Sequence, residues 1–282
     1  MNLEELKKKM DEEHYIYDDT LATVLYVALQ LGRPLLIEGA AGVGKTEVAK
    51  VMAAALDREL VRLQCYEGLD ESKALYEWNY QKQLLSIQVN MNAQDREALT
   101  RSLFSDEYLL ERPLLKSIRS EKPVVLLIDE IDKADLEFPN DLLWELDRME
   151  FHIPETKQTV TARHRPVVII TSNAEKELPD AFLRRCVFHY IEFPDRELMA
   201  QIVRVHYPDL DQRLLTQVLE AFYRIRQLPQ VKKKPSTSEI LDWLQALTWG
   251  GVDPARVVKE VPYLGVLLKK NEDMDAMRRV WR

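Results

Sequence analysis

A short glycine-rich segment restricts the fold of this chain more than any other stretch. The sequence GAAGVGKT occupies residues 39–46 and holds three of the chain's 8 glycines. An apolar run at 35–37 precedes it, and apolar residues at helical spacing follow it over 48–55. The segment satisfies the G-x-x-x-x-G-K-[ST] pattern of phosphate-binding loops, which join a strand to a helix. We therefore predict strand, loop and helix here; a glycine-rich turn without a ligand is the alternative.

The residue types in this loop suit phosphate chemistry. Glycines allow backbone N–H groups to turn inward around a phosphate, next to the partial positive charge at the start of a helix. Lys45 can then reach the outer phosphates, and the Thr46 hydroxyl can ligate Mg²⁺.

Further apolar runs predict a sheet. They lie at residues 60–65, 124–129, 167–172 and 187–193, and helical stretches separate them. Together with the run at 35–37 they make five strands that alternate with helices, which is typical of a parallel sheet covered on both faces. We expect an α/β fold.

Polar residues follow two of these strands. Asp129 and Glu130 end the run VVLLIDE, and Asn173 ends VVIITSN. Carboxyl ends of parallel strands meet at the edge where α/β proteins bind ligands. Asp129 suits Mg²⁺, Glu130 suits polarising an attacking water, and Asn173 could orient that water or simply cap a helix.

Two arginines end the stretch LPDAFLRRC. Arg184 and Arg185 could present a guanidinium to the phosphate of a neighbouring subunit, where such a group stabilises transition-state charge. The alternative is a solvated helix end whose cations complement the helix dipole.

Composition bounds the remaining classes. The net charge of −8 disfavours broad binding to nucleic acid, and no apolar run reaches the roughly 18 residues of a membrane span. No secretory leader is visible, so we expect a cytoplasmic protein. The 2 cysteines argue against a disulfide scaffold.

Two insertions and a second domain complete the predicted organisation. We place an insertion at about 69–89, before a helix at 107–119, and a hairpin at about 150–165. The predicted domains are 1–194 and a small helical domain at 195–282. Tyr76, Trp78 and Tyr80 alternate, so an extended segment would show them on one face, either for client contact or as buried core.

These motifs, in this order, resemble the AAA+ ATPases, and several phrases are similar to the MoxR family, particularly its CoxD-like members. The matching stretches are GAAGVGKTEVAK, LQCYEGLDESKALYEWNYQKQLL, LLIDEIDKAD, TSNAEKELPDAFLRRCVFHYIEFPD and PSTSEILDWLQAL. The resemblance implies an αβα P-loop sandwich with a five-stranded parallel sheet and a small α-helical lid domain. It also implies a hexameric ring that binds ATP and Mg²⁺ and matures a protein client, often a metalloenzyme, beside a von Willebrand factor A (VWA) domain partner.

The resemblance assigns roles to individual residues. Lys45 and Thr46 match Walker A, Asp129 and Glu130 match Walker B, and Asn173 matches sensor 1. Arg185 matches the arginine finger, with Arg184 as the alternative. The implied nucleotide-binding residues are Gly39, Ala40, Ala41, Gly42, Val43, Gly44, Lys45, Thr46 and Glu47, with Tyr15 and Ile16 at the adenine; the implied Mg²⁺ ligands are Thr46 and Asp129.

One position departs from the family pattern, and other functions stay open. Ser238 stands where a sensor 2 arginine often lies. A P-loop kinase would share the glycine loop but needs an arginine-rich lid, and a GTPase needs an N-K-x-D string that does not occur. A nucleotide-gated ring scaffold with little turnover and a motor stimulated by nucleic acid are the alternatives within the family.

Overall fold

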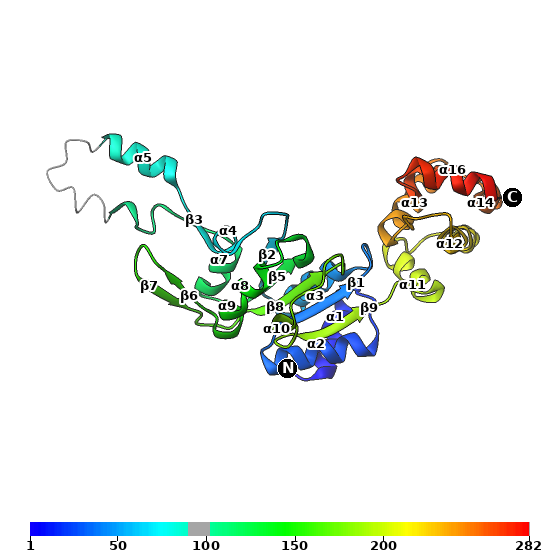
Figure 1. Cartoon of the computed structure of the whole chain (residues 1–282). Helices are drawn as coiled ribbons and strands as arrows, with labels where there is room; N and C mark the ends of the chain where they lie inside the picture. The colour runs from blue at the N-terminus through cyan, green and yellow to red at the C-terminus, as the bar shows by residue number, and fades with distance from the viewer. Residues whose placement is uncertain (90–101, 282) are drawn as a thin grey trace. The chain divides into compact units, whose positions relative to one another are not determined.

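The computed structural model describes residues 1–89 and 102–281. The chain forms two compact units, one of residues 1–39 and 45–190, the other of 40–44 and 191–282. The first unit contains a five-stranded parallel sheet flanked by helices (Figure 1), as the sequence predicts. Its strands are β2 (Glu59–Gln64), β5 (Val124–Asp129), β8 (Val167–Ser172), β1 (Leu35–Gly39) and β9 (Val187–Ile191), in that spatial order.

The strands of this sheet are apolar because both faces are covered. All six residues of β5 are buried, and β8 is buried from its second residue onward. The edge strand β2 instead alternates, with Val61 and Leu63 buried and Arg62 and Gln64 exposed. This alternation leaves polar side chains on one face of β2, close to the end of β5.

The helices of the first unit begin at capping residues or loops that the sequence supplies. Asp18 caps the helix at Asp19–Leu31, and Gly32 ends it with a left-handed backbone at φ 60°. The helices are α1 (Leu3–Glu12), α2 (Asp19–Leu31), α3 (Lys45–Leu56), α4 (Glu71–Leu75), α5 (Tyr80–Val89), α7 (Pro113–Arg119), α8 (Phe138–Asp141), α9 (Leu143–Arg148), α10 (Asp180–Leu183) and the 3₁₀ turn η1 (Ile131–Lys133).

The second unit has helices at the C-terminus of the chain and its own core. Trp243 is fully buried there, and its indole Nε1–H donates to the Pro262 carbonyl at 2.6 Å. The helices are α11 (Arg196–His206), α12 (Gln212–Gln227), α13 (Thr237–Trp249), α14 (Pro254–Glu260), α15 (Leu264–Leu267) and α16 (Asn271–Val280).

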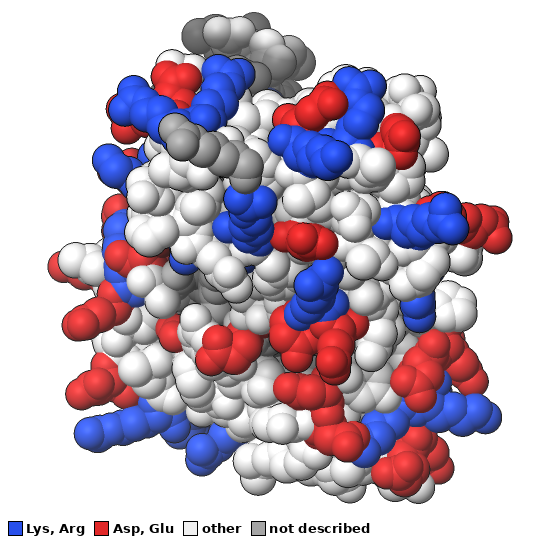
Figure 2. Space-filling model, turned by 90° about the vertical axis from the view of Figure 1, so that its right-hand side faces the viewer, with Lys and Arg blue, Asp and Glu red and all other residues white. Residues whose placement is uncertain are grey.

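Charges of both signs are distributed over the surface drawn in Figure 2. Lysine and arginine side chains alternate there with aspartate and glutamate, so the described side chains on this face form no continuous basic patch. Within residues 1–89 and 102–281, no helix is long and apolar enough to cross a membrane.

The insertion differs in detail from the sequence prediction. Strands β3 (Tyr76–Trp78) and β4 (Leu109–Glu111) pair antiparallel. The helix expected at 107–119 was therefore wrong in its first part, because residues 109–111 form this strand and the helix starts at Pro113.

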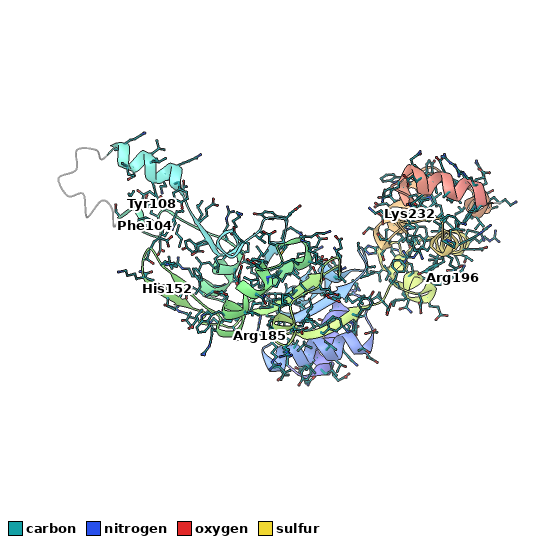
Figure 3. The ribbon with its side chains drawn as sticks, viewed as in Figure 1. Phe104, Tyr108, His152, Arg185, Arg196 and Lys232 are labelled. Carbon is teal, nitrogen blue, oxygen red and sulfur yellow. The ribbon has the colours of Figure 1, made fainter. Side chains whose placement is uncertain are left out.

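The three alternating aromatics do not share one face. Tyr80 begins α5 and is exposed, which breaks the extended alternation expected over residues 76–80. Trp78 is 4% exposed and packs edge-on against Tyr76 and Phe104. Phe104 is labelled in Figure 3. The contacts of Trp78 are those of a core residue, so the buried-core alternative holds for Trp78, and the expectation that all three aromatics share one face was wrong.

A second two-stranded sheet follows α9. Strands β6 (Glu150–Ile153) and β7 (Gln158–Thr161) pair antiparallel around the turn-like PETK segment. A hairpin is expected at this place from the alternation of extended and turn residues in the sequence.

Candidate functional site

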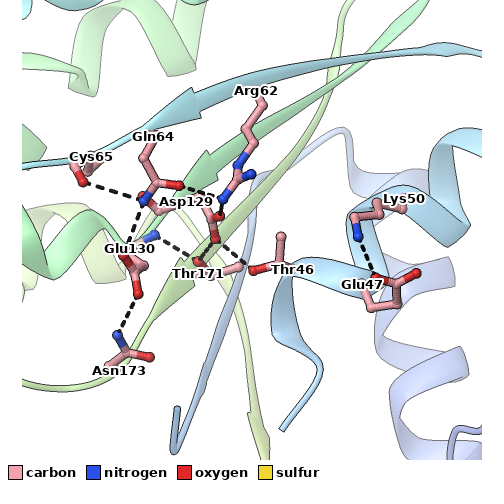
Figure 4. A network of polar contacts seen from close by, with 10 residues as sticks. All are labelled: Thr46, Glu47, Lys50, Arg62, Gln64, Cys65, Asp129, Glu130, Thr171 and Asn173. Atoms are coloured by element: carbon pink, nitrogen blue, oxygen red, sulfur yellow. Dashed lines mark hydrogen bonds and ion pairs between the residues drawn. The ribbon is translucent and has the colours of Figure 1, made fainter. Parts of the chain in front are cut away.

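The carboxyl ends of three neighbouring strands bring the predicted polar residues together. β1, β8 and β5 are adjacent, and the chain leaves them at Gly39, Ser172 and Asp129. Figure 4 shows the resulting network of side chains. Lys45, Thr46, Asp129, Glu130 and Asn173, which the sequence predicts as functional, all belong to the hydrogen-bonded set.

Asp129 is the centre of this network. It is 2% exposed, and its Oδ1 accepts hydrogen bonds from the Thr46 hydroxyl at 3.0 Å and the Thr171 hydroxyl at 2.6 Å. A carboxylate and a hydroxyl so close together form the hard oxygen donor set that Mg²⁺ prefers. The residues present therefore fit the divalent cation that the sequence implies.

Glu130 is held in a backbone conformation that few non-glycine residues adopt. Its φ of 57° lies in the left-handed region, where the chain turns from β5 into η1. The Glu130 N–H donates to Thr171 Oγ1 at 2.8 Å. The Thr171 hydroxyl therefore links the two acidic residues, since it accepts from Glu130 and donates to Asp129.

Two amides hold the carboxylate of Glu130. Gln64 Nε2 donates to Oε2 at 3.1 Å, and Asn173 Nδ2 donates to Oε1 at 3.2 Å. Each carboxylate oxygen thus has a partner from a different strand end. A carboxylate fixed in this way at an accessible edge can accept a proton from a water molecule.

Lys45 is a buried cation among acids. Its Nζ donates to the Gly39 carbonyl at 2.7 Å and to Asn173 Oδ1 at 2.8 Å. Burial lowers the pKa of Lys45, while the charge of Asp132 and then of Glu130 opposes that shift. Lys45 and Asn173 are therefore positioned together, and Asn173 contacts both Lys45 and Glu130.

Asp132 holds the backbone of the segment that contains Asn173 by hydrogen bonds. Its Oδ2 accepts from the backbone N–H groups of Asn173 at 3.1 Å and Glu175 at 3.0 Å. Its Oδ1 is buried and has no hydrogen-bond partner among the described residues. Burial, together with the charge of Asp132, raises the pKa of Glu38 near the same edge. The negative charge of this edge therefore comes from more residues than the sequence motifs name.

The glycine loop connects β1 to α3. Gly42 and Gly44 have φ of 76° and 95°, a conformation that side chains with a Cβ rarely adopt. The first turn of α3 contains Thr46 and Glu47, and Glu47 pairs with Lys50 at 2.7 Å on the surface. The predicted contacts of the loop residues 39–47 with a nucleotide stay a prediction.

The residues expected at the adenine lie near the start of α3. Tyr15 and Ile16 are half-buried between α1 and α2. Burial raises the pKa of Tyr15, and the charge of Glu47 adds to this shift, so the phenol lies within electrostatic reach of α3. No described contact joins Tyr15 or Ile16 to the network around Asp129.

The two arginines lie away from this network. Arg184 is exposed at the end of α10, and Arg185, labelled in Figure 3, follows it. Arg185 Nε pairs with Asp147 Oδ2 at 2.6 Å, and its Nη1 donates to the Ala181 carbonyl at 2.8 Å. Among the residues that the structure describes, no contact joins either guanidinium to Lys45 or Glu130.

Several residues of the network were missed from the sequence. They are Arg62, Gln64, Thr171 and Asp132, together with Glu38 as a charged neighbour. The alternation of polar Arg62 and Gln64 in the apolar run LVRLQC is the signal that could have found two of them, because alternate strand residues share a face. Thr171 and Asp132 adjoin recognised motifs and carry no separate pattern.

The fold and the site are those of an α/β domain with a phosphate-binding loop, and comparison with known families shows the family to which the chain belongs. The family model described as "AAA domain (dynein-related subfamily)" matches residues 34–186, which is more than half of the chain. The protein belongs to this AAA family. The matched range contains strands β1, β2, β5 and β8 of the parallel sheet and every residue of the network, and it ends directly before β9.

The curated relatives are distant, and the first two are longer than this chain. The chain is 25% identical to the gas vesicle ATPase GvpN of Haloferax mediterranei, over 71% of this chain and 58% of that protein. It is 26% identical to a Lon protease of Halothermothrix orenii, over 69% of this chain and 23% of that protein. An uncharacterized protein of Staphylococcus saprophyticus is 23% identical, over 66% of each chain. The chain thus spans less than two thirds of the first two relatives.

Proposed function

We propose that this protein binds ATP with Mg²⁺ at the carboxyl edge of its sheet and hydrolyses the ATP to ADP and phosphate. The observation that carries the proposal is the network in which Asn173 bridges Lys45 and Glu130 while Thr46 contacts Asp129. Membership of the AAA family and the similarity to a protein named an ATPase support it.

On this proposal, each residue of the network has its own role in ATP hydrolysis. Lys45 would hold the outer phosphates, and Thr46 and Asp129 would hold the cation. When bound, Mg²⁺ screens the charge of the phosphates. Glu130 would accept the proton of the attacking water, and Asn173 would keep that water and the Lys45 ammonium in line. Gln64 and Asn173 orient the Glu130 carboxylate, so the base is placed before the water arrives.

The Glu130→Gln variant tests this proposal. Gln keeps the size of the side chain but cannot accept the proton, so we expect phosphate release to fall about 10²- to 10⁴-fold. Binding of a fluorescent ATP analogue should change by less than about threefold. Glu137→Gln, at an exposed residue just before α8, is the matched control and should keep the wild-type rate. Equal, negligible rates in wild type and Glu130→Gln would favour the nucleotide-gated scaffold instead.

We further propose a ring of MoxR type in which Arg185 of one subunit serves the site of the next. The exposure of Arg185 supports this part: Asp147 and Ala181 fix Nε and Nη1, and 38% of the side chain remains exposed to a neighbouring subunit. On this proposal the ring remodels a protein client, with a VWA-domain protein as partner and a metalloenzyme as the client class. The mixed charges of the face in Figure 2 favour a protein client over nucleic acid.

Mixing two inactive variants tests the shared site. Arg185→Ala should lower turnover by about 10³-fold or more, because a finger in trans stabilises transition-state charge. Arg185→Ala subunits retain Glu130, and Glu130→Gln subunits retain Arg185, so mixing the two should restore activity at their common interfaces. Restoration with Arg184→Ala, and not with Arg185→Ala, would assign the finger to Arg184. Full activity of both single arginine variants would contradict the shared site.

A further inference from the structure

Arg62 lies on the edge strand β2, beside the residue proposed to hold the divalent cation. In the parallel pair β2–β5, Gln64 is opposite Asp129, and Arg62 lies two residues earlier on the same face of the strand. A long side chain on a diagonal neighbour reaches across this spacing. Arg62 Nη2 lies 2.5 Å from Asp129 Oδ2 (Figure 4).

The environments of the two partners differ. Asp129 is 2% exposed, whereas half of the Arg62 side chain is exposed. The pair therefore differs from an ordinary surface ion pair. Among the described hydrogen bonds, the only cationic partner of this buried carboxylate is the long, half-exposed side chain of Arg62. Arg62 can leave for water at little cost, and Asp129 cannot.

Both oxygens of Asp129 are occupied in this arrangement. Oδ1 accepts from the hydroxyls of Thr46 and Thr171, and Oδ2 accepts from Arg62. A Mg²⁺ ion needs an oxygen ligand at about 2.0–2.1 Å and a negative charge that is not already neutralised. The guanidinium takes up both the free oxygen and the charge.

We propose that Arg62 is a positioning residue that competes with the divalent cation for Asp129. Free metal then binds poorly to the nucleotide-free site, and metal enters with a nucleotide, whose phosphate oxygens add the ligands that displace the guanidinium. The inference rests on the proposed function for its nucleotide step. Its first step, competition between Arg62 and a metal for Asp129, needs no nucleotide.

The contact of Arg62 with Gln64 gives the competition a second consequence. A second 2.5 Å contact joins Arg62 Nη2 to Gln64 Oε1, and Gln64 Nε2 donates to Glu130. Release of Arg62 from Asp129 therefore frees a donor that also holds the Gln64 amide. Loss of the cation competitor and reorientation of the amide beside Glu130 would occur together.

Binding of Mn²⁺ without nucleotide tests the competition. Mn²⁺ shares the preference of Mg²⁺ for oxygen ligands, and free Mn²⁺ is measured directly by electron paramagnetic resonance. We expect Arg62→Ala to bind Mn²⁺ about tenfold more tightly than wild type, and the double variant Arg62→Ala, Asp129→Asn to lose that gain. Arg163→Ala removes an exposed arginine that pairs with Glu121 at the same 2.5 Å and should match wild type.

The outcomes separate this inference from the proposed function. Equal or weaker Mn²⁺ binding by a folded Arg62→Ala variant would overturn it, as would an equal gain with Asp129→Asn present. Circular dichroism and thermal unfolding establish that each variant is folded. Arg62→Lys, which keeps the charge in a shorter donor, should stay within about threefold of wild type; a gain equal to that of Ala would overturn competition by charge. Failure of wild type to bind ATP would contradict the proposed function and leave the Mn²⁺ comparison intact.

Discussion

Buried polar side chains are used differently in the two units of the molecule. In the α/β unit several of them lie together at the carboxyl edge of the sheet, where Lys45, Asp129, Asp132 and Thr171 are all buried. In the helical unit, Asp273 is the one buried charged or polar side chain among the described residues. Burial of polar groups costs free energy unless they find partners. In the first unit this cost arises largely at the candidate functional site. In the second it arises at Asp273, which binds the loop at residues 232–233.

Asp132 and Asp273 make the contrast specific, because both are aspartates that accept two backbone N–H groups. Asp273 uses both oxygens, Oδ1 for Lys232 at 2.9 Å and Oδ2 for Lys233 at 3.1 Å. Asp132 uses Oδ2 for both of its donors, and its buried Oδ1 has no partner within the described part of the chain. An unpaired buried oxygen costs about 1–3 kcal/mol. The comparison indicates that Asp273 stabilises its fold, whereas Asp132 holds the Asn173 segment in place at the candidate site.

Of the variants at these two aspartates, Asp132→Ala has the largest expected effect. Removal of the acceptor releases the backbone of Asn173, so the bridge between Lys45 and Glu130 loosens and turnover should fall about 10- to 100-fold. The free energy of unfolding should change by less than about 1 kcal/mol, because the lost hydrogen bonds are offset by the removal of the unpaired oxygen. Steady-state phosphate release and urea unfolding measure the two quantities.

Two further variants make this prediction sharp. Asp132→Asn keeps one oxygen acceptor and should recover most of the turnover. Asp135→Ala removes an exposed acid three residues on, which accepts one N–H from Gly68 at 3.3 Å, and should leave turnover unchanged. A large loss of stability with unchanged turnover in folded Asp132→Ala would break the contrast with Asp273.

A smaller effect, on stability alone, is expected for Asp273→Ala. Loss of two charge-assisted hydrogen bonds should lower the free energy of unfolding of the helical unit by about 1–3 kcal/mol. The backbone N–H of Lys232, then that of Lys233, lowers the pKa of Asp273 in the folded state. Its stabilisation is therefore present above the unfolded pKa of about 3.9 and is lost as the pH falls through the folded value.

Urea unfolding of wild type and Asp273→Ala from pH 7 to pH 3 checks both statements. The difference between the two proteins should be constant down to about pH 5 and should close below about pH 4. Asp275→Ala lies on the same helix, with 44% of its side chain exposed, and should show less than about 0.5 kcal/mol at any pH. A gap that persists unchanged at pH 3 would show that the carboxylate charge is not what Asp273 contributes.

The sheet and most of the polar residues at its carboxyl edge can be predicted from the sequence, because both depend on short-range patterns. Five apolar runs predict the five strands, and the positions directly after two of them supply Asp129, Glu130 and Asn173. Parallel strands expose their carboxyl ends at one edge, so residues far apart in the sequence meet there. Lys45 and Thr46 join them because the glycine loop leaves the neighbouring strand.

Arg62 and Asp132 depend on information that a single sequence does not display. Whether Arg62 reaches Asp129 depends on the register of β2 against β5, and a shift of one residue would turn it to the other face. Asp132 acts through backbone N–H groups at residues 173 and 175, which have no sequence signature. Tyr80 was misplaced because the segment changes from strand to helix after Trp78.

The Thr171 hydroxyl limits which residues this position can accept. The side chain is fully buried, donates its one hydrogen to Asp129 and accepts from the Glu130 N–H. Valine has the same shape but would leave the Glu130 N–H without this acceptor and Asp129 with one donor fewer, and a carboxylate would add a charge beside Asp129. Serine would keep both bonds without the β-branched methyl that suits a buried strand. Position 171 therefore requires a small buried side chain that both donates and accepts a hydrogen bond, which restricts the choice to threonine or serine.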